Sequence, residues 1–245
     1  MMRKVLQTVF AGTAAVGLTG VASVTVSVLS GVDTRAADQV LRAWGRSSLA
    51  AAGVRHEAYG LEHIPEDGNV VFVCNHQSHF DAMVNFAHIR KHTRYVAKAE
   101  LFKIPVFGRA MRRAGNIPVQ RTGGAGDKAR LSEAVTAVRE RVSVLFFAEG
   151  TRSPDGELKP FKKGAATLAI QAQVPVVPMA LSGTRLILPK GGRAVRWGQR
   201  VALVVGRPVP TQGLTLDDRD TLTRRLEEAV AGLYAEARER SGDTP

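Results

Sequence analysis

The sequence predicts an α/β fold, with a mixed, largely parallel sheet flanked by helices and preceded by a membrane-associated helical hairpin. Short apolar runs recur from about residue 59 onward, and stretches of helical periodicity separate them, as in alternating strands and helices. Before that point no charged residue occurs from Val5 to Val32, which predicts an apolar helix. We therefore expect membrane-anchoring helices over residues 1–55 and one α/β domain over residues 56–245.

The uncharged N-terminal stretch is long enough to cross a bilayer. As a helix it would extend roughly 40 Å, against a hydrocarbon core of about 30 Å. The apolar region of a cleaved signal peptide is normally only about 7–15 residues long, so we favour an anchor, with a signal peptide or a buried helix as alternatives. Because Arg3 and Lys4 would hold the N-terminus inside, a single span would send the domain outside, and a hairpin in one leaflet is expected instead.

Residues 34–54 form a basic amphipathic pattern with Trp44 near its boundary. The pattern is typical of a helix at the lipid interface, and equally of a helix packed on the domain. Residues 100–115 mix apolar and basic side chains in the same way. They indicate either a lipid-facing entrance or a core helix with a solvated basic edge.

Six apolar runs in the second part are expected to be strands. Two helices have clear patterns, one beginning near Asp127 and one at the C-terminus, where Thr215 and Asp218 have the spacing of a capping box. Three turn-rich loops separate these elements, at residues 122–127, 153–160 and 189–193. The expected strands are residues 69–75, 94–98, 116–121, 143–150, 174–183 and 201–206.

The charge balance predicts a polyanionic partner. Lys and Arg number 34 against 22 Asp and Glu, a formal net charge of +12, so nucleic acid, anionic lipid and an acidic protein all qualify. Aromatic residues make up only 6% and no nucleic-acid motif is present, which argues against nucleic acid. The single cysteine, Cys74, excludes an intrachain disulfide and a cysteine-based zinc site, and we expect it in the core.

The segment NHQSHFD, residues 75–81, places two histidines and an aspartate directly after an expected strand. His76 and Asp81 can meet if the segment is a strand-to-helix turn, and a carboxylate that binds one imidazole nitrogen makes the other a general base. The spacing is also common in ordinary turns, and His76 with His79 could bind a metal. Farther along, His88 and His92 are expected on a solvated helix face.

Cationic side chains gather at the ends of three other expected strands. Arg152 has the planar fork that matches phosphate oxygens, and Gly150 permits a sharp turn whose amides face an anion. Lys98 and Arg121 each end a strand as well. Since strand ends meet at one edge of such a sheet, the sequence predicts a phosphate pocket there.

Four blocks, NHQSHFD, GNIPVQR, FFAEGTRS and VVPMALSG, occur in this order. Over residues 60–210 the chain resembles the glycerolipid acyltransferase family, and within it the 1-acylglycerol-3-phosphate acyltransferase branch. Two departures bear on head-group preference: Ala148 replaces a frequent Pro, and Gln120 replaces a frequent Asp. The resemblance implies catalytic roles for His76 and Asp81, phosphate binding by Arg121, Arg152 and Lys98, substrate positioning by Glu149, Gly150 and Thr151, and an acyl pocket shaped by Val177, Pro178 and Met179.

The implied reaction is acyl transfer from acyl-CoA or acyl carrier protein to the free hydroxyl of lysophosphatidic acid, giving phosphatidic acid. It needs no metal or cofactor. The thioester donor implies the cytoplasmic face of the inner membrane, whose anionic surface would attract a basic chain. Alternatives are another acceptor, such as glycerol phosphate or a lyso-aminolipid, a thioester hydrolase, or a non-catalytic binding module. No G-x-S-x-G elbow is present, which argues against a lipase.

Overall fold

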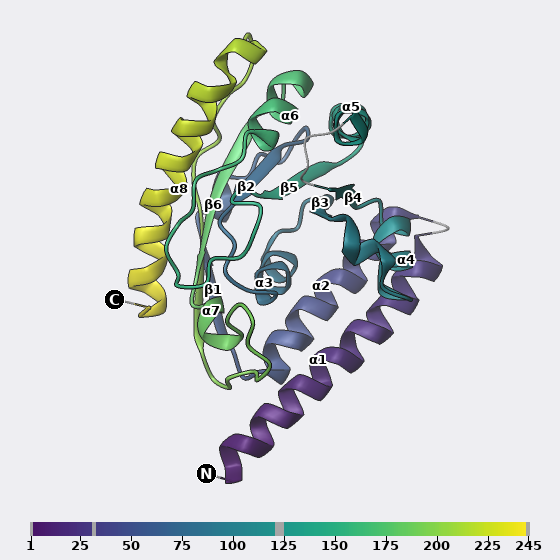
Figure 1. Ribbon diagram of the computed structural model, residues 1–245, viewed down its shortest axis with the longest axis vertical. Helices are drawn as coiled ribbons and strands as arrows, with labels where there is room; N and C mark the ends of the chain where they lie inside the picture. Colours follow the sequence, from purple (N-terminus) through teal and green to yellow (C-terminus); the bar gives the residue numbers. More distant parts are fainter. Residues whose placement is uncertain (1, 31–32, 121–124, 244–245) are drawn as a thin grey trace.

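The computed structural model describes residues 2–30, 33–120 and 125–243. Its sheet has the strand order β1-β7-β6-β2-β5-β3-β4, and every neighbouring pair is parallel except β6 and β7 (Figure 1). The predicted fold class is therefore confirmed. The strands are β1 (Arg55–Tyr59), β2 (Val71–Cys74), β3 (Thr93–Lys98), β4 (Ile117–Val119), β5 (Ser143–Phe147), β6 (Val176–Ser182) and β7 (Arg200–Val205).

Helices cover both faces of the sheet (Figure 1). The side chains of β2 alternate between them: Val71 and Val73 pack with α5, α6 and α8, whereas Phe72 and Cys74 pack with α2 and α3. Cys74 thus lies in the core, as predicted. The helices are α1 (Met2–Leu29), α2 (Thr34–Ala51), α3 (Phe80–His88), α4 (Phe107–Arg113), α5 (Ala125–Glu140), α6 (Gly164–Ala172), α7 (Thr184–Ile187) and α8 (Arg219–Ser241).

Each of the six expected strand segments overlaps a strand, and both expected helices are present. The capping box at Thr215 and Asp218 forms, on a short 3-10 helix that leads into α8. Strand β1 was not predicted, because its sequence RHEAY is polar and it lies at the edge of the sheet beside β7. An edge strand needs less apolar side-chain surface than a central one, so hydrophobic periodicity does not reveal it.

The N-terminal helices α1 and α2 form a hairpin that lies against the domain (Figure 1). Helix α2 packs on α3 at Gly45, where a Cβ atom would lie 2.5 Å from the Met83 carbonyl oxygen. Trp44 packs against Phe86 of α3, and its Nε1 donates to Thr19 Oγ1 of α1 at 3.1 Å. Of the two interpretations of residues 34–54, the packed helix is the one observed. The division of the chain at residue 55 stays a prediction.

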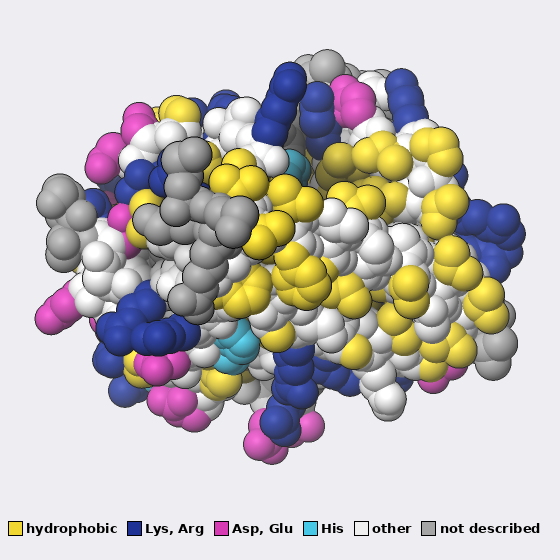
Figure 2. All heavy atoms as spheres, turned by 90° about the horizontal axis from the view of Figure 1, so that it is seen from below, with side chains coloured by type: hydrophobic (Ala, Val, Ile, Leu, Met, Phe, Trp, Pro, Cys, Tyr) yellow, Lys and Arg dark blue, Asp and Glu magenta, His cyan; other side chains and the backbone are white. Residues whose placement is uncertain are grey.

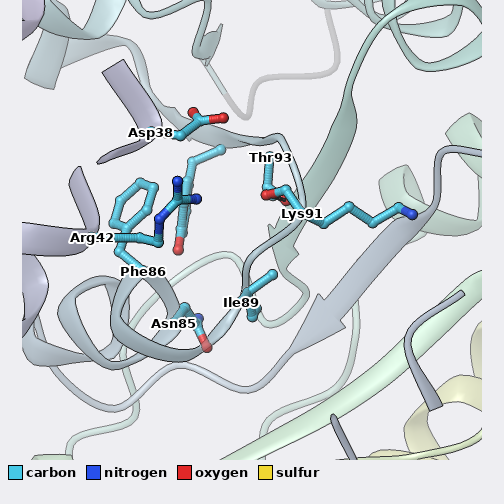
Figure 3. Close-up of a pocket in the computed structure, with 8 residues that line it drawn as sticks. Asp38, Arg42, Asn85, Phe86, Ile89, Lys91 and Thr93 are labelled. Atoms are coloured by element: carbon cyan, nitrogen blue, oxygen red, sulfur yellow. Dashed lines mark hydrogen bonds between the residues drawn. The ribbon is translucent and has the colours of Figure 1, made fainter. Parts of the chain in front are cut away.

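A buried charged cluster attaches α2 to the start of β3. Asp38 Oδ1 accepts from Arg94 at 2.7 Å, and Asp38 Oδ2 lies 2.5 Å from His92 Nδ1. Burial alone would raise the pKa of Asp38, but the His92 hydrogen bond and the Arg94 charge lower it below its usual value. Figure 3 shows Asp38 and Arg42 of α2 facing Thr93 at this point.

The prediction of a solvated helix face for His88 and His92 is wrong. His92 follows α3 and contacts Asp38, and His88 at the end of α3 lies 2.8 Å from His56 Nδ1 on β1. Burial, followed by the charges of His56 and Arg46, lowers the pKa of His88 to about 4, so that it is neutral at physiological pH. Both partners, His56 and Asp38, are distant in sequence.

The outer face of α1 is apolar and exposed. In the described part of the chain, Val5–Leu29 is the one helical segment long and apolar enough to cross a membrane. Figure 2, which views the molecule from below, shows hydrophobic side chains gathered across this side with Lys and Arg around the edge. The exposed large apolar residues of α1 are Val5, Leu6, Val9, Phe10, Val16, Val21, Val24 and Val28.

Candidate active site

The turn between β2 and α3 folds around one buried carboxylate, that of Asp81. Its Oδ2 accepts the backbone N–H groups of Gln77 at 2.7 Å and Ser78 at 2.9 Å, and its Oδ1 accepts from Thr184 Oγ1 at 2.5 Å. His76 Nδ1 lies 2.7 Å from Oδ2. Because that oxygen already accepts two N–H groups, it acts as an acceptor for His76 too, and Nδ1 carries the hydrogen.

In the neutral imidazole, this tautomer leaves Nε2 of His76 as the nitrogen that can accept a proton. The imidazole stacks on the Phe147 ring, with 4.0 Å between centroids and 14° between planes. It also lines a cavity. A half-buried imidazole with one nitrogen bound to a carboxylate and the other facing a cavity has the arrangement of a general base.

The loop after β5 is attached to the same turn through Glu149. Its carboxylate is buried, and its two oxygens accept the backbone N–H groups of His76 at 2.7 Å and Lys159 at 3.2 Å. Gly150 follows with a φ of +71°, a conformation that few other residues adopt at low cost. Burial raises the pKa of Glu149 to about 7, although the two N–H donors oppose the shift. The geometry makes Glu149 the link between the β2 and β5 loops.

A cavity of about 460 Å³ is lined by His76 and extends between the N-terminal hairpin and α4. Most of its lining is apolar, and its charged lining residues are all cations. No Asp or Glu occurs among the described residues around it. The lining includes Thr19, Ala22, Val26, Leu41 and Trp44 of the hairpin, Phe107, Ala110 and Met111 of α4, and the polar residues His76, His79, Lys98, Thr151, Arg152 and Lys190.

Four of the predicted site residues line this cavity: His76, Lys98, Thr151 and Arg152. Lys98 and Arg152 line it, and Lys98 also lies 3.6 Å from Glu100 in an exposed ion pair, which binds weakly in water. Arg121 lies outside the described residues. His79 also lines the cavity. The surrounding protein partly removes its ring from water, and this desolvation, followed by the charge of Arg152, lowers the pKa of His79. The described residues contain no group of three or more possible metal ligands.

The residues predicted to shape an acyl pocket lie away from this cavity, and that role stays a prediction. Val177, Pro178 and Met179 lie in β6, where their side chains are buried in the sheet, and none of them lines the cavity. The cavity walls come instead from α1, α2, α3, β3 and α4. Sequence reasoning also missed Thr184 and Lys190, whose contacts with Asp81 and Thr151 join segments far apart in the chain.

The comparison with known families decides the identity of this arrangement. A family model described as acyltransferase matches residues 55–182, more than half of the chain. The chain belongs to the acyltransferase family. The matched segment of this acyltransferase contains His76, Asp81 and the loop from Glu149 to Arg152, so the family assignment rests on the part of the chain that builds the site.

Individual relatives are similar over larger parts of this acyltransferase. A chloroplastic 1-acyl-sn-glycerol-3-phosphate acyltransferase of Brassica napus is 38% identical over 151 residues, which are 61% of this chain and 44% of that relative. The human 1-acyl-sn-glycerol-3-phosphate acyltransferase alpha is 36% identical over 185 residues, 75% of this chain and 65% of the relative. The chain thus spans between two fifths and two thirds of the length of these relatives.

A solved structure is similar over almost the whole fold of this acyltransferase. The crystal structure of the 1-acyl-sn-glycerophosphate (LPA) acyltransferase PlsC from Thermotoga maritima aligns with a TM-score of 0.79 at 27% sequence identity. The alignment covers 95% of both chains, so it includes the N-terminal hairpin as well as the sheet.

The raised pKa of Glu149 predicts a stability that depends on pH. Because the folded protein holds this proton more tightly than the unfolded chain, the free energy of unfolding falls as the pH rises through the interval up to about 7. We expect the stability of the wild type relative to Glu149→Gln to fall between pH 5 and pH 7, with a limiting slope of about 1.4 kcal/mol per pH unit. Urea unfolding across this range measures it.

Glu140→Gln is the matched control, because Glu140 is exposed on the end of α5. Its stability should run parallel to that of the wild type at every pH. Parallel profiles for Glu149→Gln as well would show that the buried carboxyl does not titrate in this range, and would contradict the prediction.

Proposed function

We propose that the protein transfers a fatty acyl group from an acyl thioester, acyl-CoA or acyl carrier protein, to the free hydroxyl of lysophosphatidic acid. The observation that carries the proposal is the His76–Asp81 pair beside an apolar cavity whose charged lining, in the described part of the chain, consists of cations. A general base, an apolar chain site and an anion site are what this reaction requires. The names of the relatives support the same acceptor.

In the proposed step, Nε2 of His76 takes the proton of the acceptor hydroxyl while Nδ1 keeps its hydrogen bond to Asp81. The hydroxyl oxygen attacks the thioester carbonyl carbon and forms a tetrahedral oxyanion. The carbon–sulfur bond then breaks, the ester is released, and the thiolate takes the proton back from His76. No covalent bond to the enzyme forms, so His76 acts as base and then as acid.

The cavity supplies the two binding functions. Its volume of about 460 Å³ is in the range typical of small-molecule sites, and its apolar walls suit an acyl chain. We assign binding of the acceptor's phosphate to Arg152 and Lys98, which line the cavity, and to Arg121 from the sequence alone. A thioester hydrolase would use water at Nε2 instead, and the presence of an anion site favours the lipid acceptor over water.

The protein is proposed to work at the cytoplasmic face of the inner membrane. The exposed apolar face of α1 suits lipid, and two more apolar side chains, Ile104 and Val106, are exposed between the basic residues Lys103 and Arg109. Val106 has a φ of 62°, rare for a β-branched residue, within a turn closed by the Phe107 N–H and the Pro105 carbonyl. This strained turn exposes the Val106 side chain beside an apolar cavity that takes a lipid.

Replacement of His76 tests the reaction. We expect His76→Ala to lower kcat by about 10²–10⁴-fold, the usual contribution of a general base. The protein should stay folded, because Asp81 keeps its hydrogen bonds to Gln77, Ser78 and Thr184. The assay uses acyl-CoA and lysophosphatidic acid in detergent micelles and counts free thiol and phosphatidic acid separately. Equal amounts of both products from the wild type are expected. Thiol release without phosphatidic acid would contradict the proposal and indicate a hydrolase or another acceptor.

The membrane surface is tested by charge on the outer face of α1. Val16→Glu combined with Val24→Glu should sharply reduce the fraction of protein that floats with anionic liposomes in high salt, because both side chains are exposed and apolar. Leu216→Glu is the matched control, since Leu216 is an exposed apolar residue before α8, away from α1. Unchanged flotation of the α1 variant would show that another surface binds the membrane.

A further inference from the structure

Among the described residues, three cations line the cavity that His76 also lines, and one of them, Lys98, has an acidic partner. Lys98 pairs with Glu100, whereas neither Arg152 nor Lys190 forms an ion pair with a carboxylate of the described residues. The Lys190 ammonium donates instead to a neutral group, Thr151 Oγ1, at 3.3 Å. Cations placed together without carboxylates favour an anionic ligand, because their mutual repulsion is relieved only when it binds.

Lys190 occupies a defined position in a tight turn. The N–H of Gly192 donates to the Pro189 carbonyl at 3.0 Å, and Gly191 has a φ of +80°, so residues 189–192 form a type II turn with Lys190 at its second position. Gly191 is the residue that permits the positive φ.

The turn is attached to the catalytic segment just before Lys190. The Leu188 carbonyl accepts from Ser78 Oγ at 2.8 Å, and Ser78 is also one of the N–H donors to Asp81. Thr184, which donates to Asp81, lies in α7, the short helix that ends just before Leu188. The hydrogen bonds that hold the catalytic turn therefore also place Lys190.

In the order of the strands, Lys190 and Lys98 come from opposite sides of the strands that carry His76 and Arg152. In the sheet order β6-β2-β5-β3, His76 follows β2, Arg152 follows β5 and Lys98 ends β3, whereas Lys190 follows β6 through α7 (Figure 1). The ammonium of Lys190 bonds Thr151, the residue next to Arg152. An anion beside Arg152 would thus have a cation on each side.

We propose that Lys190 binds the phosphate of the lysolipid acceptor together with Arg152, an inference that rests on the proposed function. In lysophosphatidic acid only two carbons and an ester oxygen separate the reacting oxygen from the phosphorus, so this phosphate must lie close to His76. The diphosphate of CoA is separated from its thioester by the whole pantetheine arm. A phosphate monoester carries nearly two charges and three acceptor oxygens, enough for several cations.

The test is selectivity between a charged and an uncharged acceptor. Lys190→Met should lower kcat/KM for lysophosphatidic acid by about 10- to 100-fold, the loss of one charge-assisted hydrogen bond, and leave kcat/KM for the monoacylglycerol of the same chain unchanged. Lys190→Arg should restore most of the loss. Arg193→Met is the matched control in the same loop, because Arg193 is exposed and does not line the cavity. It should behave as the wild type.

An equal loss with both acceptors, or no loss with either, would overturn the inference about Lys190 while leaving the proposed function intact. If the wild type makes no phosphatidic acid, the proposed function itself fails. Equilibrium binding then decides about Lys190, measured in a Trp197→Phe background through Trp44, which lines the cavity. Weaker binding of lysophosphatidic acid by Lys190→Met than by the protein with Lys190, together with unchanged binding of monoacylglycerol, supports the phosphate contact. If the two proteins bind each lipid equally well, the phosphate contact is overturned.

Discussion

The buried carboxylate of Asp81 is the constraint on which the site depends. A charge without access to water must be satisfied by hydrogen bonds, and Asp81 accepts four, from the turn, from His76 and from Thr184. These donors come from the segments that follow two neighbouring parallel strands, β2 and β6, so the charge is fully satisfied only when the turn and α7 are in place together. The same requirement holds the His76 ring in one orientation and with one tautomer.

The rest of the fold brings substrates to that ring. Glu149 joins the β5 loop to the backbone of His76, so Thr151 and Arg152 have a fixed position relative to the base. On the other side, the Asp38 cluster holds α2 against β3, and α2 with α1 closes the apolar cavity. Because the inner face of α1 lines this cavity and its outer face is exposed and apolar, one helix serves both the substrate chain and the lipid surface.

The sequence predicts what depends on local pattern and fails where the partners are distant. Buried runs such as VVFVC and the helical periodicities predict the α/β fold, whereas the polar edge strand RHEAY has no such signal. The H-x4-D spacing places His76 beside Asp81 because both lie in one turn. The error at His92 arises because its ion pair with Asp38 of α2 is set by tertiary packing. The role of Met179 in an acyl pocket stays a prediction, since this side chain is buried in the central strand β6. Lys190 could not be found, since only the fold brings it to Thr151.

The tautomer of His76 tests the central claim most directly. The protein has six histidines, so nitrogen-15 NMR of histidine-labelled protein in detergent can resolve them, and His76→Gln assigns the signal by difference. At the pH where acyl transfer is observed, the account predicts a neutral ring whose proton is on Nδ1 and is donated to Asp81, while Nε2 is unprotonated. A proton on Nε2 with a bare Nδ1 would mean that Asp81 does not orient a base, and would contradict the account.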